Sequence, residues 1–383
     1  MKSALVELKD RNTIRVEKRY EIHTNGHDNA YPTRMERLIN SSTTAKSCAK
    51  AMAKFIIGAG FSFAFPEETY IGKDQDGSMT PADVLKDIAY SIAYHNAFAL
   101  HFNYNLFGQI ISVTPIPYKY CRYGLSDSSG YKGKIVVYDN WDYSKSKVFR
   151  KDDFEVFDIF NPNKDVIMYQ IQKAGGIQKY NGQVLIVKLE NAIYPLSLID
   201  PAQDDADTEY KLSLYKNRTA SKGFVGKKIV TTEEFDDDDD RKLFQQDLKN
   251  IQGFDSKGDI IHLETKFSGD DKKKQIEVAQ LDSDIKTDLF NNWESPISNN
   301  IRRCFNSIPP VLVDFVEGKL GNTSGESFKM AQAFYNSQTS EERAVITRVF
   351  KKIFAHYYLP VNPANDWNIN QLNLIADGTT TNQ

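Results

Sequence analysis

The sequence predicts a mixed α+β fold, because helical and strand patterns occupy separate stretches of the chain. Helix signals fill residues 31–63 and 80–93, short aromatic and β-branched runs dominate 98–194, and helix signals return after residue 200. With 383 residues the chain is long enough for two or three domains, or for one domain with a protruding segment. Its 40% apolar and 12% aromatic residues are sufficient for a core, so we do not expect a disordered chain.

One or two helices are expected first, with residues 1–30 as an extended arm or short strand. Apolar residues recur mostly three, four or seven positions apart on one helical face: Leu38, Ala45, Cys48, Met52, Phe55 and Ile56. Gly58 and Gly60 end this run. The next helix begins at Thr80, with Pro81 at its first position and Asp83 in its first turn. We expect Val84, Leu85, Ile88, Ile92 and Ala93 to face inward.

Strand patterns follow in five short runs separated by Gly, Asn-Pro or Asn-Gly turns. They cover residues 97–106, 108–116, 133–141, 165–173 and 183–190. The first half of the chain is therefore expected to be a compact α+β body.

The second half becomes polar and helical. A helix is expected from near Asp200 to Gly223, and Thr231 and Glu234 have the spacing of a capping box that opens a short helix. A longer helix then carries apolar residues at every fourth position: Leu281, Ile285, Leu289, Trp293, Ile297, Ile301 and Phe305. A four-residue period drifts about 40° per step around an α-helix. This winding stripe suits a helix with neighbours on both sides, and Pro296 is expected to kink or break it.

The last third opens with a double proline and the glycine-rich sequence GKLGNTSG, residues 318–325. A phosphate-binding loop needs glycine, four residues and then Gly-Lys-Ser/Thr. Here Lys319 directly follows the first glycine and Leu320 replaces the hydroxyl residue, so the spacing favours a flexible loop. Thr323 begins one expected helix and Thr339 another, each with a glutamate at capping-box spacing. The tail from residue 377 is expected to be disordered.

No other motif amounts to a catalytic or cofactor site. Gly58 and Gly60 lack the third glycine of a dinucleotide fingerprint, because Phe63 stands there and a helix precedes them. His95 and His101 have no triad partner in the sequence, so we interpret them as structural or surface residues. We therefore expect no enzymatic activity, no cofactor and no bound metal.

Five consecutive carboxylates form the most acidic stretch: Asp236, Asp237, Asp238, Asp239 and Asp240. They lack the alternating spacing of a calcium loop and cannot all point at one ion. A solvated surface at a helix start is the simpler interpretation, and contact with a basic partner is the alternative.

Charge and composition argue against several classes of protein. A net charge of −3 does not suit a protein that grips nucleic acid tightly. No run of about 18 apolar residues is present, so no membrane span is expected. The N-terminus lacks the apolar core of a signal peptide. Cys48, Cys121 and Cys304 are odd in number and far apart, which fits a reducing compartment.

The order of these pieces resembles the portal proteins of tailed bacteriophages. Residues 29–61, rich in small and apolar side chains and ending in glycine, resemble their opening helices. Residues 82–123, a helix and strands that lead to the motif Pro-x-Pro-Tyr, resemble the next section, and residues 210–224 resemble the helix leading to the protruding region. Residues 284–336 resemble the long helix, the Pro-Pro turn and the glycine-containing loop of long-tailed-phage portals. No single motif is diagnostic, and the chain is short after Tyr358, which implies a reduced or absent crown.

The resemblance implies a division into wing, stem, clip and tunnel loop. Residues 1–199 would form the N-terminal part of the wing, 200–219 the first stem helix and 220–277 the clip. Residues 278–307 would form the second stem helix, 308–325 the tunnel loop, and 326–383 the returning wing helices with a short tail. The stripe from Leu281 to Phe305 would then lie between subunits, and Asp236–Asp240 would face a partner of the clip.

The residues that would face DNA in the tunnel loop are Gly318, Lys319, Leu320, Gly321, Asn322, Thr323, Ser324 and Gly325. Polar side chains there would touch phosphates weakly and without reading the base sequence. Each phosphate contact adds salt-dependent binding affinity for DNA. A channel through which DNA slides should make few such contacts, and this agrees with the weakly acidic charge of the chain.

The function that the resemblance implies is a ring-shaped channel at one capsid vertex. Double-stranded DNA would be packaged through it by the terminase and later ejected, and a head–tail adaptor would dock to it. The expected assembly is a homo-oligomer, a dodecamer, that contacts the major capsid protein and no membrane, located in the virion and in the host cytoplasm during assembly. Two alternatives remain open: another virion scaffold or adaptor protein, and a metal-dependent enzyme that uses carboxylates in residues 200–207 and 236–240.

Overall fold

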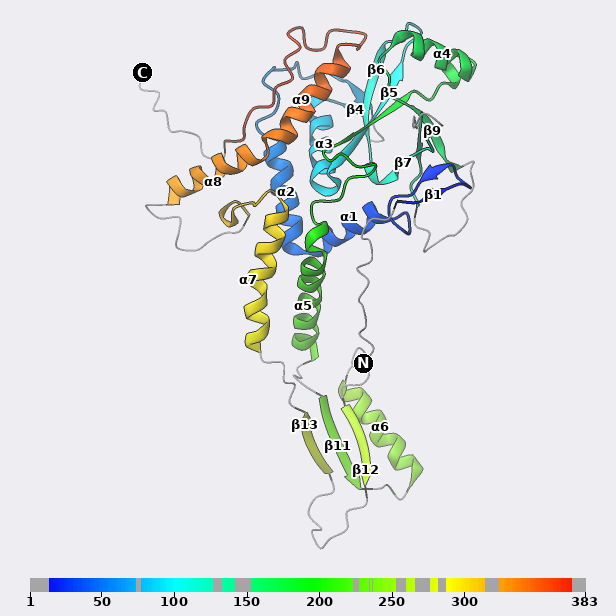
Figure 1. The fold of residues 1–383 in the computed structure, drawn as a ribbon. Coiled ribbons are helices and arrows are strands. Elements are labelled where there is room, and N and C mark those ends of the chain that lie inside the picture. The colour runs from blue at the N-terminus through cyan, green and yellow to red at the C-terminus, as the bar shows by residue number, and fades with distance from the viewer. Residues whose placement is uncertain are drawn as a thin grey trace, which may run out of the picture. The chain divides into compact units, whose positions relative to one another are not determined.

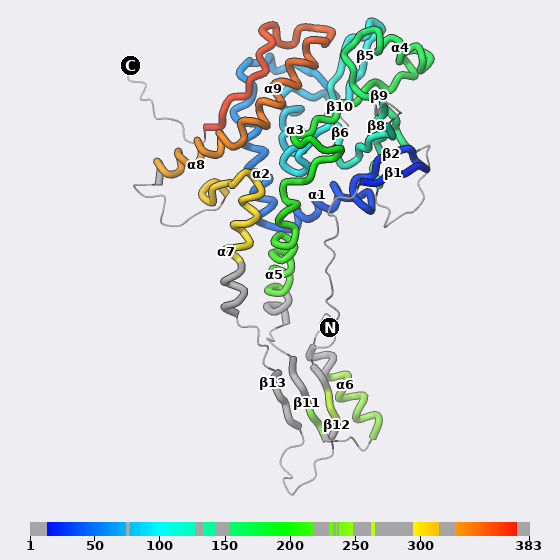
Figure 2. The backbone as a smooth tube through the Cα atoms, in the orientation of Figure 1, coloured from blue at the N-terminus to red at the C-terminus, as the bar shows by residue number. Residues whose placement is uncertain are grey.

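The computed structural model describes residues 14–73, 77–126, 133–141, 153–222, 227–233, 235, 237–252, 260–265, 276–281, 287–313 and 324–373. The chain divides into two units (Figures 1 and 2). The larger comprises Met1–Ala206 with Asn299–Gln383, and the smaller comprises Asp207–Ser298.

A six-stranded sheet organises the described part of the larger unit. Its strands are β5 (Ala97–Tyr104), β6 (Ile110–Ile116), β7 (Cys121–Tyr123), β8 (Lys134–Val137), β9 (Glu155–Ile159) and β10 (Gln183–Lys188). They lie in the order β6-β5-β10-β9-β8-β7, and among these pairs only β9 and β10 run parallel. Consequently β6 and β7, which are close in sequence, lie at opposite edges of the sheet.

Three helices of the larger unit lie in the stretches where the sequence predicts helices. They are α1 (Tyr31–Ser41), α2 (Thr43–Ile57) and α3 (Pro81–His95), and α3 contacts β5 and β6 (Figure 1). The capping box at Thr80 and Asp83 forms, with both side chain to backbone hydrogen bonds present. The predicted inward residues of α3 are all buried, and so are those of α2, whereas Leu38 in α1 is half-buried and Ile39 is buried instead.

The predicted strand at 165–173 is wrong, because these residues form helix α4 (Lys164–Ala174). The Asn163 side chain accepts a hydrogen bond from the Asp165 backbone at 2.9 Å, and Gly175 ends the helix in a left-handed conformation. Ile167 and Ile171, one helical turn apart, are the buried residues of α4. The missing strand is β9, whose residues 155–159 were not predicted.

The rest of the larger unit consists of short pairs and two long helices. The pairs are β1 (Val16–Glu17) with β2 (Ile22–His23), and β3 (Gly72–Lys73) with β4 (Ser78–Met79). Helices α8 (Ser324–Gln338) and α9 (Ser340–Phe354) follow near the C-terminus. Short 3-10 turns cover Tyr118–Tyr120, Ile177–Lys179, Asp200–Ala202 and Pro310–Leu312. Thr339 precedes α9 as predicted, but its hydroxyl donates to the Tyr335 carbonyl, so the predicted capping box is absent.

The smaller unit holds a three-stranded sheet and helix α6 (Asp238–Gln252) among its described residues. The strands are β11 (Lys227–Glu233), β12 (Ile260–Thr265) and β13 (Ile276–Leu281), with β11 in the middle. Two predictions fail here. Thr231 lies inside β11 and opens no helix, and Leu281 ends β13 instead of belonging to the long helix. A strand paired on both sides gains backbone hydrogen bonds that a local capping signal cannot match.

Helices α5 (Gln203–Lys222) and α7 (Thr287–Cys304) enter and leave the smaller unit. The start and end of α5 agree with the prediction. Of the kink or break expected at Pro296, the break does not occur, because helix α7 continues through this residue. Inside the smaller unit the two helices lie side by side, where Lys216 forms an ion pair with Glu294 (Figure 1).

No helix among the described residues is both long and apolar enough to cross a membrane.

Candidate channel and assembly surfaces

The central part of the predicted tunnel loop, residues 314–323, falls outside the described residues. Gly318 to Thr323 belong to the part of the chain that is not described, and Ser324 and Gly325 begin α8. The Pro-Pro turn before them is described: a short 3-10 helix covers Pro310–Leu312. The assignment of the loop to a DNA channel therefore stays a prediction from the sequence.

The predicted inter-subunit stripe divides into three parts. Ile285 is not described, and of Leu289 and Trp293 only the helical backbone is described. Ile297 is 8% exposed. Ile301 and Phe305 are completely buried within the single chain. These two are core residues of the larger unit and offer no surface to a neighbouring subunit, which corrects their assignment.

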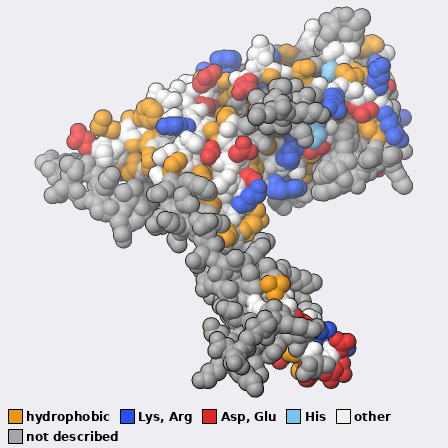
Figure 3. Space-filling view, turned by 60° about the horizontal axis from the view of Figure 1, so that its bottom comes forward, with side chains coloured by type: hydrophobic (Ala, Val, Ile, Leu, Met, Phe, Trp, Pro, Cys, Tyr) orange, Lys and Arg blue, Asp and Glu red, His pale blue; other side chains and the backbone are white. Residues whose placement is uncertain are grey.

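The acidic segment forms the start of α6. Asp236 is not described, whereas Asp238, Asp239 and Asp240 occupy the first helical turn, where the helix dipole favours negative charge. The side chain of Asp237 accepts the Asp239 N–H at 3.1 Å. Figure 3 shows acidic side chains gathered on this unit.

Basic neighbours partly balance these charges. Asp238 pairs with Arg241 at 2.6 Å, and Asp239 pairs with Lys242 at 3.1 Å. Arg241 also contacts Glu264 of β12 at 2.8 Å, which fixes α6 against the sheet. Within the described residues, no group of three or more His, Cys, Asp and Glu side chains is arranged to hold a metal ion.

A buried polar junction that the sequence analysis missed lies where the chain leaves α7. Asn306 and Ser307 both have left-handed backbones, with φ of 55° and 53°. The Asn306 amide donates to the Glu342 carboxylate at 2.8 Å, and the Tyr335 hydroxyl donates to the Phe305 carbonyl at 3.0 Å. Burial raises the pKa of Glu342 above its ordinary value.

Arg343 extends this junction to α2. Its guanidinium donates to the Phe55 carbonyl at 2.9 Å, to the Thr339 hydroxyl at 2.7 Å, and to the Asn336 carbonyl. The end of α7, the α8–α9 corner and the end of α2 are thus held together around one buried arginine. The only sequence signal here was the apparent capping residue Glu342, whose side chain in fact bonds to Asn306.

A second buried cluster connects the start of α1 to the turn before α5. The Tyr31 hydroxyl donates to Asp200 at 2.8 Å and accepts the Ser197 N–H at 3.0 Å. The Gln203 amide also donates to Asp200, at 2.7 Å. Burial is the main cause that raises the pKa of Tyr31. Asp200, one of the carboxylates considered for a metal, is therefore already hydrogen-bonded within the fold.

The glycines and histidines that were considered as sites have structural roles. Gly58 ends α2, and the chain near Asn370 lies against it, with the Ala59 N–H donating to the Asn370 carbonyl at 3.0 Å. His95 is buried, and desolvation lowers its pKa to about 3, so it is neutral. His101 bonds to the Asn181 carbonyl at 2.6 Å.

Comparison with known proteins gives a likeness of fold only. No protein-family model matches the chain, and no curated protein matches it. Among solved structures, a chain in the neck of the empty gene transfer agent (GTA) particle, computed with C6 symmetry, is similar with a TM-score of 0.50 and 10% identity. That similarity covers 85% of this chain and 82% of the other.

Two further structures are similar at lower scores. The neck of the native GTA particle, computed with C12 symmetry, has a TM-score of 0.48 at 12% identity and covers 84% of this chain and 80% of that one. A phage portal protein of the HK97 family from Corynebacterium diphtheriae has a TM-score of 0.44 at 11% identity, covering 82% and 89%. The chain thus shares its fold with a chain of a GTA particle neck, and the α+β class predicted from the sequence is confirmed.

Proposed function

We propose that this chain is a portal protein, of which several copies form a ring around a channel for double-stranded DNA. The observation that carries the proposal is the shared fold with a chain of a GTA particle neck over 85% of the present chain. The order of features along the sequence, which resembles that of tailed-phage portal proteins, favours the same conclusion. The proposal gives the chain a structural role in a virion and no catalysis.

The finer parts of the proposal come from the portal resemblance. The assembly is a dodecamer at one capsid vertex, contacting the major capsid protein. The terminase packages DNA through it, the DNA leaves by the same channel, and a head–tail adaptor docks to the clip, residues 220–277. The channel is lined by the tunnel loop, residues 308–325, and the chain passes through the host cytoplasm during assembly.

The first test is the particle mass by native mass spectrometry, with negative-stain images of the same sample. A closed ring with a central hole, whose mass is about twelve times the 43.6 kDa of the chain, supports the proposal. A single chain or a dimer that also fails to assemble in the presence of its capsid proteins would contradict it.

Trp293 tests the stem assignment. We expect Trp293→Ala to weaken subunit association, because a large aromatic anchor contributes strongly to an interface. The measurement is the ring-to-subunit ratio as a function of protein concentration. Met330→Ala, at a residue that is 68% exposed on α8, is the control for a general effect of losing an apolar surface side chain. An unchanged ring-to-subunit ratio for Trp293→Ala would show that Trp293 does not contribute to the interface.

A further inference from the structure

The exposed side of helix α2 carries a row of lysines. Lys46, Lys50 and Lys54 stand four residues apart and all three are exposed, whereas the opposite side of the helix is buried. Each four-residue step along an α-helix rises about 6 Å and turns the side chain by about 40°. The three lysines therefore form a row about 12 Å long on one side of α2, which we call the lysine ridge.

The charges of the lysine ridge are not paired. The 15 residues of α2 contain no aspartate or glutamate, although pairs of opposite charge four residues apart are a common way to stabilise an exposed helix face. Among the residues that the structure describes, no ion pair involves the three lysines. Glu36 of the neighbouring helix α1 pairs with Lys119 at 2.8 Å. The ridge thus presents three positive charges to solvent on a chain whose net charge is −3.

The composition of this helix face fits phosphate groups better than a protein surface. Thr43, which is exposed, and Ser47, which is half-buried, lie on the same side of α2 as the lysines. Lysine and hydroxyl side chains are common donors to phosphate oxygens. None of the exposed large apolar side chains among the described residues belongs to α2, whereas protein–protein interfaces are depleted of lysine and depend on aromatic or arginine anchors. The ligand that this face fits is therefore a polyanion with many phosphates.

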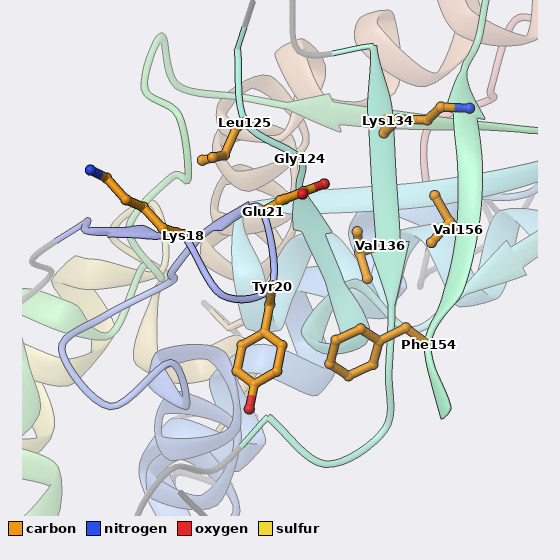
Figure 4. Close-up of a pocket in the computed structure, with 9 residues that line it drawn as sticks. All are labelled: Lys18, Tyr20, Glu21, Gly124, Leu125, Lys134, Val136, Phe154 and Val156. Atoms are coloured by element: carbon orange, nitrogen blue, oxygen red, sulfur yellow. The ribbon is translucent and has the colours of Figure 1, made fainter. Parts of the chain in front are cut away.

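A pocket beside β8 and β9 offers a comparison (Figure 4). Its volume is about 550 Å³, and Lys18 and Lys134 are among its lining residues. Glu21 lines the pocket as well, and Lys134 forms an ion pair with Asp158. A polyanion would meet carboxylates there, so these two lysines do not form a surface equivalent to the lysine ridge.

We propose that the lysine ridge binds the phosphate backbone of double-stranded DNA, weakly and without reading the base sequence. The choice of DNA rests on the proposed function, to which the inference adds a DNA-binding surface on α2, separate from the predicted tunnel loop. Duplex DNA carries one negative charge about every 1.7 Å along its axis, so a ridge about 12 Å long spans a length of duplex with about seven charges. Three lysines contact only some of these phosphates, which agrees with weak binding by a chain of net charge −3.

The salt dependence of DNA binding tests the proposal. The dissociation constant of the full-length chain for a labelled duplex is measured by fluorescence anisotropy between about 50 and about 200 mM salt. Each phosphate contact adds about 0.9 to the slope of log affinity against log salt concentration. Lys46→Gln, Lys50→Gln and Lys54→Gln together should lower this slope by about 2.7, so the parent chain should lose about 40-fold more affinity than the variant over this range. Lys50→Gln alone should lower the slope by about 0.9.

Three other exposed lysines provide a matched control. Lys164 and Lys173 belong to α4, and Lys179 follows this helix. Their joint replacement by glutamine changes the net charge by the same amount and should leave the slope unchanged. An equal fall in slope for both triple variants would overturn the proposal, because it would show a general effect of net charge.

Further results separate this proposal from the proposed function. Rings in native mass spectrometry that bind no DNA, or that bind it with the same slope in the parent chain and the ridge variant, would overturn the DNA contact and leave the portal function standing. Absence of both rings and DNA binding would overturn both proposals. Polyglutamate is the competitor that represents an acidic protein segment: if it displaces DNA from the parent chain as effectively as unlabelled duplex of the same total charge, the ridge is a surface for such a segment and the DNA assignment is wrong.

Discussion

Gly58 and Gly60 offer a matched test of how the C-terminal segment is attached to α2. Gly58 has φ 60° and ψ −139°, and Gly60 has φ 85°. A Cβ on Gly58 would lie 1.9 Å from the carbonyl oxygen of Asn370, whereas a Cβ on Gly60 would meet nothing within 4 Å. Alanine at either position strains the backbone, but only at position 58 does it collide with the neighbouring segment.

The expected destabilisation follows from these two contributions. The left-handed backbone costs a non-glycine residue about 1–2 kcal/mol, and this is the whole expected effect of Gly60→Ala. Gly58→Ala must also displace Asn370, which exchanges backbone hydrogen bonds with Ala59 at 3.0 Å and with Gly60 at 2.9 Å. Each lost bond costs about 1 kcal/mol, so the total for Gly58→Ala is about 3–4 kcal/mol.

Displacing Asn370 also disturbs an aromatic cluster. Trp367, three residues earlier, is completely buried and stacks on Phe354 with ring centroids 4.2 Å apart. Its ring also lies 5.4 Å from that of Phe61, just after Gly60. Loosening this packing adds to the cost of Gly58→Ala, so the value from the hydrogen bonds is a lower bound.

Thermal unfolding measures the difference. For a domain of this size class, 1 kcal/mol corresponds to a shift in Tm of about 2–4 °C. We expect Gly60→Ala to lower the Tm by about 4 °C and Gly58→Ala by about 10 °C. Equal shifts for the two variants would refute the reasoning, because they would show that the close approach of Asn370 contributes nothing.

Three further predictions concern buried polar groups and the tunnel loop. Tyr31→Phe removes the hydroxyl that bonds to Asp200 and should lower the Tm by about 2–6 °C, whereas Tyr169→Phe, at a residue that is 63% exposed, should leave it unchanged; equal shifts would contradict the burial argument. Burial raises the pKa of Glu342, so the stability linked to its proton is fully present below the ordinary glutamate pKa and is lost as the pH rises through the raised value. Glu342→Gln should therefore flatten the fall in Tm as the pH rises above the ordinary glutamate pKa of about 4.3, and an unaltered pH profile would argue against it. Lys319→Ala, or deletion of residues 321–325, should impair DNA packaging in an infection assay while rings still assemble, and loss of assembly would count against the loop assignment.

Local signals in the sequence predicted the elements that depend on them. The helix after Thr80 needed only its capping residues and an apolar face, and both are present in the structure. The small-residue helices before Gly58 were predicted for the same reason. At α4 the local signals conflict: the β-branched and aromatic composition of residues 165–173 predicts a strand, whereas Asn163 and Gly175 are the cap and the end of the helix that forms.

Other predictions were wrong because no local signal in the sequence indicates the structure that forms. Residues 155–159 are interrupted by charged side chains, and β9 exists because it pairs with both β8 and β10. Thr231 has a capping-box partner in sequence, yet it lies in β11, which is paired on both sides. Ile301 and Phe305 fit the apolar stripe on α7, but the structure buries them within their own chain. In each case the deciding contacts come from residues distant in sequence.

The sequence by itself determined the α+β class, the positions of most helices and the resemblance to portal proteins, because these depend on periodicity, caps and the order of segments. Only the tertiary structure showed the buried junction of Asn306, Glu342 and Arg343, since its partners come from three separate helices and the end of a fourth. It also decided that β6 and β7, which are close in sequence, lie at opposite edges of one sheet. Strand order arises from long-range pairing, which no local pattern in the sequence encodes.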